Sequence, residues 1–146
     1  MTRYLLDTNI ISSATKPLPS QPLTEWMAKQ VDDDLFICSL SLAEIYRGIL
    51  EKPSGKKRRE LEEWFKGPEG PQALFRGRVL AFNEEAALIW ARLMSQGTHA
   101  GRPSSALDMV VAAIGEVNDC VVVTDNERHF PGVNLLNPLR SAGSQA

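Results

Sequence analysis

The strongest constraint on the fold is a regular alternation of short apolar, β-branched runs with longer segments of helical periodicity. Strands separated by helices are typical of a parallel sheet, because each parallel connection must return to the starting edge of the sheet. With 146 residues the chain has room for one α/β domain with a mainly parallel central sheet of four to five strands. The pattern predicts strands over residues 4–6, 35–38, 79–82, 120–123 and 133–136. It predicts helices over residues 8–14, 21–31, 41–51, 56–66, 84–96 and 104–117, and a Gly/Pro loop over 67–71.

Composition excludes several classes of protein. Hydrophobic residues make up 43% and charged residues 23%, a balance typical of a globular domain and not of a disordered chain. The net charge is -2, so any contact with nucleic acid must come from a local basic patch. No apolar run is long enough to span a membrane, and Asp7 interrupts the opening apolar run too early for a signal peptide. We therefore expect a cytoplasmic domain over residues 1–140 and a disordered tail over 141–146.

The cysteines and histidines narrow the kind of metal site that is possible. Cys38 and Cys120 both lie in predicted buried strands, and without an export signal they are expected to be free thiols. Neither they nor His99 and His129 form the short-spaced pairs of a zinc site. Any metal must therefore be held by oxygen atoms.

Acidic residues follow two of the predicted strands. Asp7 directly follows strand 4–6, and Glu44 lies in the first turn of the helix after strand 35–38. In an open parallel sheet ligands bind beyond the carboxyl ends of the strands, so both side chains are expected at that edge. Each has a structural alternative. Asp7 or Thr8 can cap the following helix, and Ser41 with Glu44 fits a capping box.

Asp108 interrupts a predicted helix that is otherwise nearly apolar all round. Helical periodicity gives the stripe facing the sheet as Leu107, Val110, Val111, Ile114 and Val117. Asp108 falls on a different stripe, with Ala112 and Gly115. A carboxylate there is costly unless a cation or several hydrogen bonds compensate it. A capping box with Ser105 is the structural alternative, and the pattern leaves open how helix 84–96 connects to this one.

A fourth polar cluster follows strand 120–123, at Thr124, Asp125 and Asn126. Oxygen-bearing groups that converge from separate segments suit a hard cation. Mg²⁺ prefers such ligands, keeps several of its waters and is often shared with a phosphate substrate. Without metal, mutual repulsion among the carboxylates would raise their pKa values.

Four motifs occur in a fixed order from Tyr4 to about Pro138. They are L-L-D-T-N at 5–9, S-L-A-E-I-Y-R-G at 41–48, D-M-V-V-A-A at 108–113 and V-T-D-N-E-R-H-F at 123–130. Each is weak alone, but together, over nearly the whole chain, they resemble the PIN domain, in particular the VapC-type toxins of bacterial toxin–antitoxin pairs. The resemblance implies a compact α/β/α endoribonuclease that uses Mg²⁺ or Mn²⁺ to cleave phosphodiester bonds of RNA.

The resemblance also implies roles for particular residues. Asp7, Glu44, Asp108 and Asn126 would be the catalytic positions, and Asp7 and Asp108 the metal ligands. Asn126 stands where the fullest family pattern has a fourth acid, and the nearest acid is the preceding residue, so the number of metal ions, one or two, is left open. Thr124 would be a polar support near the metal.

The same resemblance implies protein partners as well as an RNA substrate. We expect a homodimer bound by a small antitoxin protein that places a basic side chain over the acidic pocket. A dense basic cluster at Lys52 and residues 56–59 can serve RNA binding or be only a solvated helix face.

Two alternatives to a ribonuclease compete with this expectation. Asn126 leaves open a non-catalytic PIN-like module that binds RNA or protein. A phosphatase with Asp7 as nucleophile is disfavoured, because such enzymes of the haloacid dehalogenase type have a second Asp two residues later and this chain has Asn9.

Overall fold

A single parallel sheet organises the chain in the computed structural model, which describes residues 2–14 and 20–139. Its strands are β1 (Arg3–Leu6), β2 (Leu35–Cys38), β3 (Val79–Leu80), β4 (Cys120–Val123) and β5 (Leu135–Leu136). They pair in the order β3-β2-β1-β4-β5, and every pair is parallel. The predicted α/β class and five-stranded parallel sheet are confirmed. The predicted tail over 141–146 lies outside the described residues.

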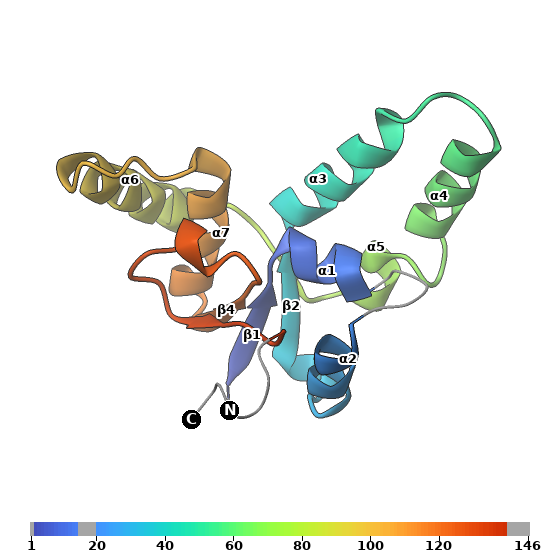
Figure 1. The fold of residues 1–146 in the computed structure, drawn as a ribbon, viewed down its shortest axis with the longest axis horizontal. Helices are drawn as coiled ribbons and strands as arrows, with labels where there is room; N and C mark the ends of the chain where they lie inside the picture. Colours follow the sequence, from blue (N-terminus) through green and yellow to red (C-terminus); the bar gives the residue numbers. More distant parts are fainter. Residues whose placement is uncertain (1, 15–19, 140–146) are drawn as a thin grey trace.

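Helices occupy most of the chain between the strands (Figure 1). They are α1 (Thr8–Ala14), α2 (Gln21–Ala28), α3 (Ser39–Leu50), α4 (Lys56–Lys66), α5 (Pro71–Leu74), α6 (Glu84–His99) and α7 (Ala106–Val117). Two short 3-10 helices, η1 (Asp32–Asp34) and η2 (Glu127–His129), precede β2 and follow β4. No helix in the described part of the chain is long and apolar enough to cross a lipid bilayer.

Both faces of the sheet are covered, as the apolar strands require. Successive side chains of a strand point to opposite faces. Leu5 packs in the cluster formed with α6 and α7, and Leu6 packs in the cluster formed with α1 and α2. Because both residues are almost fully buried, β1 is a central strand between two layers of helices. This is the three-layer α/β/α arrangement that the resemblance implied.

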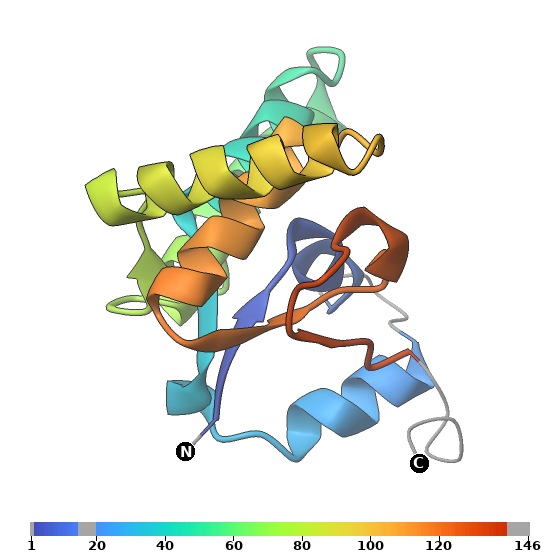
Figure 2. The same cartoon turned by 90° about the vertical axis from the view of Figure 1, so that its left-hand side faces the viewer.

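The connection between the last two long helices follows from the way they cross. Figure 2 shows α6 lying across the outer side of α7. The indole Nε1 of Trp90 on α6 donates a hydrogen bond to the carbonyl of Ala106, at 2.9 Å. The turn between the helices passes through Gly101, whose φ of 71° favours glycine. Because α6 crosses α7, α7 can begin at the carboxyl edge of the sheet and run back toward β4.

The predicted sheet-facing stripe of α7 is partly wrong. Leu107 is 49% exposed, whereas Ala112 and Gly115 are buried. A Cβ on Gly115 would stand 3.0 Å from Cγ2 of Val122 and 3.6 Å from Cδ2 of Leu5. The small side chains therefore let the helix approach the sheet closely. Large apolar side chains alone did not identify the buried face of α7. Asp108 lies on this small-residue stripe, one turn before Ala112.

Other differences from the sequence-based prediction are local. Helix α3 begins at Ser39, two residues earlier than predicted, and β3 and β5 are two-residue strands. The predicted loop 67–71 ends in the short helix α5, because Pro71 occupies a first-turn position where its missing N–H is not needed. The cysteines are free and buried, as expected. Burial raises the pKa of both thiols, that of Cys120 to about 11, so both stay protonated near neutral pH.

The two helix-interior glycines on α3 and α7 make a matched test of this packing. Gly115→Ala should lower the free energy of unfolding, because the added methyl meets the stiff, buried Val122. Gly48→Ala, where a Cβ would meet nothing within 4 Å, should raise it by about 0.5–1 kcal/mol through helix propensity. Urea unfolding of both variants measures this. Equal stabilisation by the two substitutions would contradict the close approach of α7 to the sheet.

Candidate active site

Asp7 stands at the carboxyl end of the central strand and is only 5% exposed. Its backbone N–H continues the β1–β4 ladder by donating to the Val123 carbonyl at 2.9 Å. Its carboxylate accepts two hydrogen bonds, one from the Thr8 amide at 2.8 Å and one from the Thr124 hydroxyl at 2.9 Å. Its backbone carbonyl accepts the first hydrogen bonds of α1, from the amides of Ile10 and Ile11. Asp7 therefore directly precedes the helix, but its carboxylate accepts from the Thr8 amide and not from the second or third helical amide, as a side-chain cap would, and it stays at the sheet edge.

Burial makes the Asp7 carboxylate reluctant to ionise. Its pKa rises from 3.8 to about 6, chiefly because the charged form is taken out of water. The hydrogen bonds from Thr124 and Thr8 oppose this rise, and the negative charges of Asp108 and Glu44 add to it. The two other acids are thus near enough to act on Asp7 electrostatically, although all three come from different elements.

Glu44 reaches this edge from the first half of α3. Its Oε1 accepts a hydrogen bond from the Thr8 hydroxyl at 2.7 Å, and that hydroxyl also lies 2.8 Å from the Oγ of Ser41. The predicted capping box of Ser41 and Glu44 is wrong, because α3 begins at Ser39 and Ser41 is a fully buried residue inside the helix. Thr8 thus bridges the segment after β1 to the helix after β2.

Asp108 projects from the first turn of α7. Its Oδ2 lies 3.1 Å from Nδ1 of His129, and its side chain is 24% exposed. The Ser105 hydroxyl accepts a hydrogen bond from the Asp108 amide at 3.3 Å and so caps the helix, as expected. The carboxylate that would complete a capping box faces His129 instead, because η2 brings that imidazole to the start of α7.

The polar residues after β4 contact two different segments: Thr124 bonds to Asp7, and Asp125 contacts Asn9. The Thr124 hydroxyl, fully buried, donates to Asp7 and accepts from the Asn126 amide at 3.0 Å. Asn126 therefore connects to Asp7 through its backbone and Thr124, and it precedes η2. Asp125 points elsewhere, with its Oδ1 3.5 Å from Nδ2 of Asn9. The acid next to Asn126 thus lies beside Asn9 of α1.

The donor set suits a hard divalent cation such as Mg²⁺. The three acids provide oxygen atoms only, and two of them, Asp7 and Asp108, are expected as ligands. Among residues 2–14 and 20–139, no three His, Cys, Asp or Glu side chains stand close enough together to hold a metal ion by themselves. Mg²⁺ does not need such a cluster, because it is commonly held by one or two carboxylates with water and substrate phosphate as its other ligands. The oxygen donors present are therefore chemically suited to an open site for a divalent cation that water and phosphate would complete.

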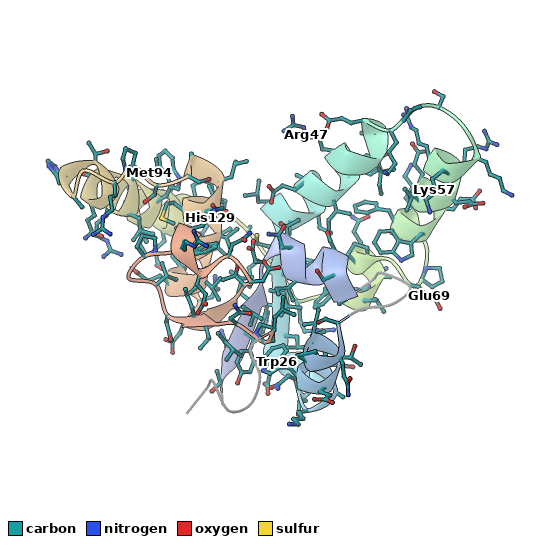
Figure 3. All side chains as sticks on the ribbon, in the orientation of Figure 1. Trp26, Arg47, Lys57, Glu69, Met94 and His129 are labelled. Carbon is teal, nitrogen blue, oxygen red and sulfur yellow. The ribbon has the colours of Figure 1, made fainter. Side chains whose placement is uncertain are left out.

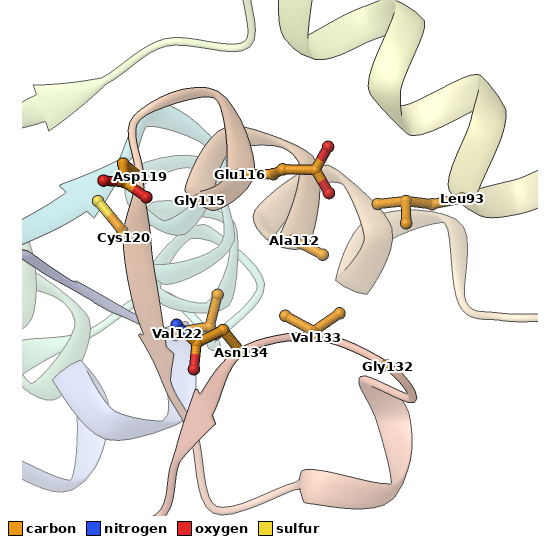
Figure 4. A pocket seen from close by; sticks show the side chains of 10 residues that line it. All are labelled: Leu93, Ala112, Gly115, Glu116, Asp119, Cys120, Val122, Gly132, Val133 and Asn134. Carbon is orange, nitrogen blue, oxygen red and sulfur yellow. The ribbon is translucent and has the colours of Figure 1, made fainter.

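Two hollows flank the acids, and others lie away from them. One of about 320 Å³ runs past Thr8 and Glu44 to Lys52 and Trp64. Another, of about 330 Å³, lies beside the start of α7 and includes His129. The pocket in Figure 4, about 250 Å³, includes Asp119 and Cys120 at the opposite, amino end of β4.

The basic cluster on α4 is partly neutralised by its own helix. Lys56 lies 3.9 Å from Glu60, and Arg58 lies 3.1 Å from Glu62. Lys57 stands on the α4 arm, well separated in Figure 3 from His129 on the other side of the molecule. These pairs favour the solvated helix face over a dedicated RNA surface.

Three residues of this edge escaped the sequence analysis. Thr8 and Ser41 were considered only as helix caps. In the structure the Thr8 hydroxyl lies within hydrogen-bond distance of both the Ser41 hydroxyl and Oε1 of Glu44. His129 was considered only as a zinc ligand, yet it contacts Asp108. Its place in the motif at 123–130, directly before the buried Phe130, was the available signal.

The raised pKa of Asp7 gives a pH-dependent prediction for the metal-free protein. An acid whose pKa is higher in the folded state favours folding below its unfolded value near 3.8, and this contribution is lost as the pH rises through about 6. Asp7→Asn lacks this titration. Its free energy of unfolding relative to the parent should therefore increase between pH 4 and pH 7.5, by up to roughly 3 kcal/mol.

Urea unfolding in the presence of a chelator measures this difference at the two pH values. The exposed Asp33→Asn is the matched control and should show a much smaller change. A difference between Asp7→Asn and the parent that does not vary with pH would contradict the burial of an Asp7 carboxylate.

Comparisons with known proteins agree with this geometry. The family model described as "PIN domain" matches residues 4–134. Toxin FitB of Neisseria gonorrhoeae is 31% identical over 92% of this chain and 96% of its own length. VapC ribonuclease Y4jK of Sinorhizobium fredii is 29% identical over 94% of this chain and 99% of its own.

A solved structure agrees as well. The crystal structure of FitAcB from Neisseria gonorrhoeae superimposes with a TM-score of 0.85 at 30% identity, covering 94% of this chain and 99% of that one. The family model spans the sheet from β1 to the residue before β5 and includes all four acid-motif segments. With the parallel sheet and the acids at its carboxyl edge, these matches show that the chain belongs to the PIN-domain family.

Proposed function

We propose that this protein is a metal-dependent endoribonuclease, the toxin of a toxin–antitoxin pair, which cleaves RNA phosphodiester bonds with carboxylate-held Mg²⁺ or Mn²⁺. The observation that carries the proposal is the buried Asp7 carboxylate at the end of the central strand, with Glu44 and Asp108 close enough to raise its pKa. Relatives named as a toxin and as a VapC ribonuclease support the same activity. The proposal places the protein in the cytoplasm, where such RNA is found.

Each acid has a distinct position in the proposed site. Asp7 and Asp108 would hold the metal ion, Asp7 with its orientation fixed by Thr8 and Thr124. The chemistry that such an ion supplies to phosphodiester hydrolysis is a more nucleophilic water and neutralised charge on the phosphoryl oxygens. Glu44 has its Oε1 engaged by Thr8, which leaves Oε2 to accept a hydrogen bond from water at this edge.

Asn126 favours one metal over two in this proposal. Its amide side chain is neutral, and the acid beside it faces Asn9. Fewer negative charges at this edge bind a second cation less well. The same residue motivates the alternative, a PIN-like module that binds RNA or protein without cleaving.

One assay separates the two functions. Purified protein is incubated with RNA and Mg²⁺, with Mn²⁺, and with chelator, and the products are resolved by length. The nuclease proposal expects internal cleavage that depends on the divalent ion. RNA that binds but remains intact under every metal condition would favour the non-catalytic module.

Asp108→Asn tests the proposed metal ligand, because it keeps the shape and removes the charge. Cleavage should fall by about 100-fold or more, the scale of losing one electrostatic stabiliser in a reaction site. Mg²⁺ should raise the melting temperature of the parent and raise it less in the variant, because binding to the folded state stabilises by mass action. Without metal, stability should stay level or rise, since the mutual repulsion of the acids is relieved.

Glu116→Gln is the matched control for that experiment. It removes a carboxylate from the same helix, two turns further along and paired with Arg92. It should leave cleavage and the response to Mg²⁺ unchanged. A fully active Asp108→Asn protein would remove Asp108 from the site and leave it only a role in helix structure.

The proposed partners are a second copy of the chain and a small antitoxin. Clustered carboxylates attract a cation, and an arginine side chain can bind them with bidentate geometry in place of metal. We expect the co-purified antitoxin to suppress cleavage and an Arg→Ala change at that side chain to restore it. Undiminished cleavage in the co-purified complex would contradict this mode of inhibition.

A further inference from the structure

We propose that the pocket beside Asp108 binds a backbone phosphate of the RNA strand, next to the phosphodiester that is cleaved. The inference rests on the proposed function and adds a substrate subsite to it. The pocket has a volume of about 330 Å³. Its walls are two prolines together with Arg102, Ser104, Ser105, Arg128 and His129.

The cationic side chains of this pocket come from two separate segments. Arg102 lies in the turn between α6 and α7, and Arg128 lies in η2 after β4. Both are exposed. In the part of the chain that the structure describes, neither guanidinium has a carboxylate within 4.0 Å. Two unneutralised guanidinium groups on one pocket create a positive potential that an anion would satisfy.

Several other arginines of the described residues are engaged, whereas Arg59 and Arg76, which also have no ion pair there, do not line this pocket. Arg47 and Arg92 form ion pairs with glutamates, and Arg58 does the same on α4. Arg78 donates to three backbone carbonyls. Arg102 and Arg128 therefore remain available to a ligand, whereas the arginines with ion pairs or backbone hydrogen bonds contribute to the fold.

The pocket shares a wall with the acidic centre. His129 lines the pocket, and its Nδ1 lies 3.1 Å from Oδ2 of Asp108. Ser105 also lines it and accepts a hydrogen bond from the Asp108 amide. The buried Phe130 and a hydrogen bond from the His129 amide to the Asn126 carbonyl, at 3.0 Å, hold η2 in this position. A strand whose reacting phosphate lies at Asp108 thus has a neighbouring phosphate within reach of the pocket.

A nucleic acid backbone suits this pocket better than a small anion alone. Guanidinium groups match the geometry of phosphate oxygens and can bind them bidentately. A chain with a net charge of -2 and several acids at its reaction edge repels a polyanion, so a local cationic site must hold the strand there. The opposite flank of the site offers Trp64 and a single lysine, Lys52. The cationic contact is therefore assigned to the Asp108 side.

The test is the double variant Arg102→Gln with Arg128→Gln. Binding of a fluorescein-labelled, unstructured single-stranded RNA is measured by anisotropy over a series of salt concentrations, with chelator present so that no cleavage occurs. Affinity at low salt should fall, and the slope of log K against log salt should become shallower by about 0.7 for each phosphate that loses its contact. Arg102→Lys with Arg128→Lys should keep most of the slope, because the charge remains.

Lys29→Gln with Arg76→Gln is the matched control. It removes the same charge from exposed residues that precede β2 and β3, at the amino edge of the sheet. This control should leave the slope unchanged, and thermal melts confirm that each variant is folded. An unchanged slope in the Arg102/Arg128 variant would overturn the inference, as would a variant that loses binding to an acidic protein partner while its RNA slope stays the same.

Cleavage by the parent protein keeps this inference distinct from the proposed function. If the parent cleaves RNA with Mg²⁺ but the double variant keeps its salt slope, only the phosphate pocket is wrong. If the slope falls but the parent does not cleave under any metal condition, the pocket stands as an RNA contact and the nuclease proposal fails.

Discussion

The burial of the Asp7 carboxylate at the carboxyl end of β1 is the constraint on which the rest of the site depends. A carboxylate that is 5% exposed is stable as an ion only if hydrogen bonds or a cation compensate the lost water. The Thr8 amide and Thr124 hydroxyl supply two hydrogen bonds, yet the pKa still rises to about 6. The compensation inside the chain is therefore incomplete. In the proposed function, a divalent cation shared with a substrate phosphate would complete it.

Topology explains why the other acids gather around Asp7. Strand β1 lies at the centre of the sheet, between β2 and β4. The helix after β2 carries Glu44, and the helix before β4 carries Asp108, so both begin at the carboxyl edge. The small residues Ala112 and Gly115 let α7 approach the sheet, and Asp108 continues their stripe. The same face of α7 therefore packs against the sheet and places Asp108 at its carboxyl edge.

Much of this arrangement could be predicted from the sequence because it depends on local patterns. Strand ends, helix starts and the parallel topology bring Asp7, Glu44 and Asp108 to one edge, whatever the details of packing. The face of α7 was predicted less well, because periodicity ranks large apolar residues as buried and cannot detect close approach through glycine. The contacts of Thr8 with Ser41 and of His129 with Asp108 join distant segments, so residue spacing does not predict them, and only the place of His129 in the motif at 123–130 pointed to this edge.

The most direct test of the account is to locate the metal itself. Crystals soaked in Mn²⁺ and measured near the manganese absorption edge reveal the ion by its anomalous scattering. The account predicts a peak within coordination distance of the carboxylates of both Asp7 and Asp108, with Thr124 still hydrogen-bonded to Asp7. A well-ordered crystal with no peak at these carboxylates, or with manganese bound only elsewhere, would contradict it.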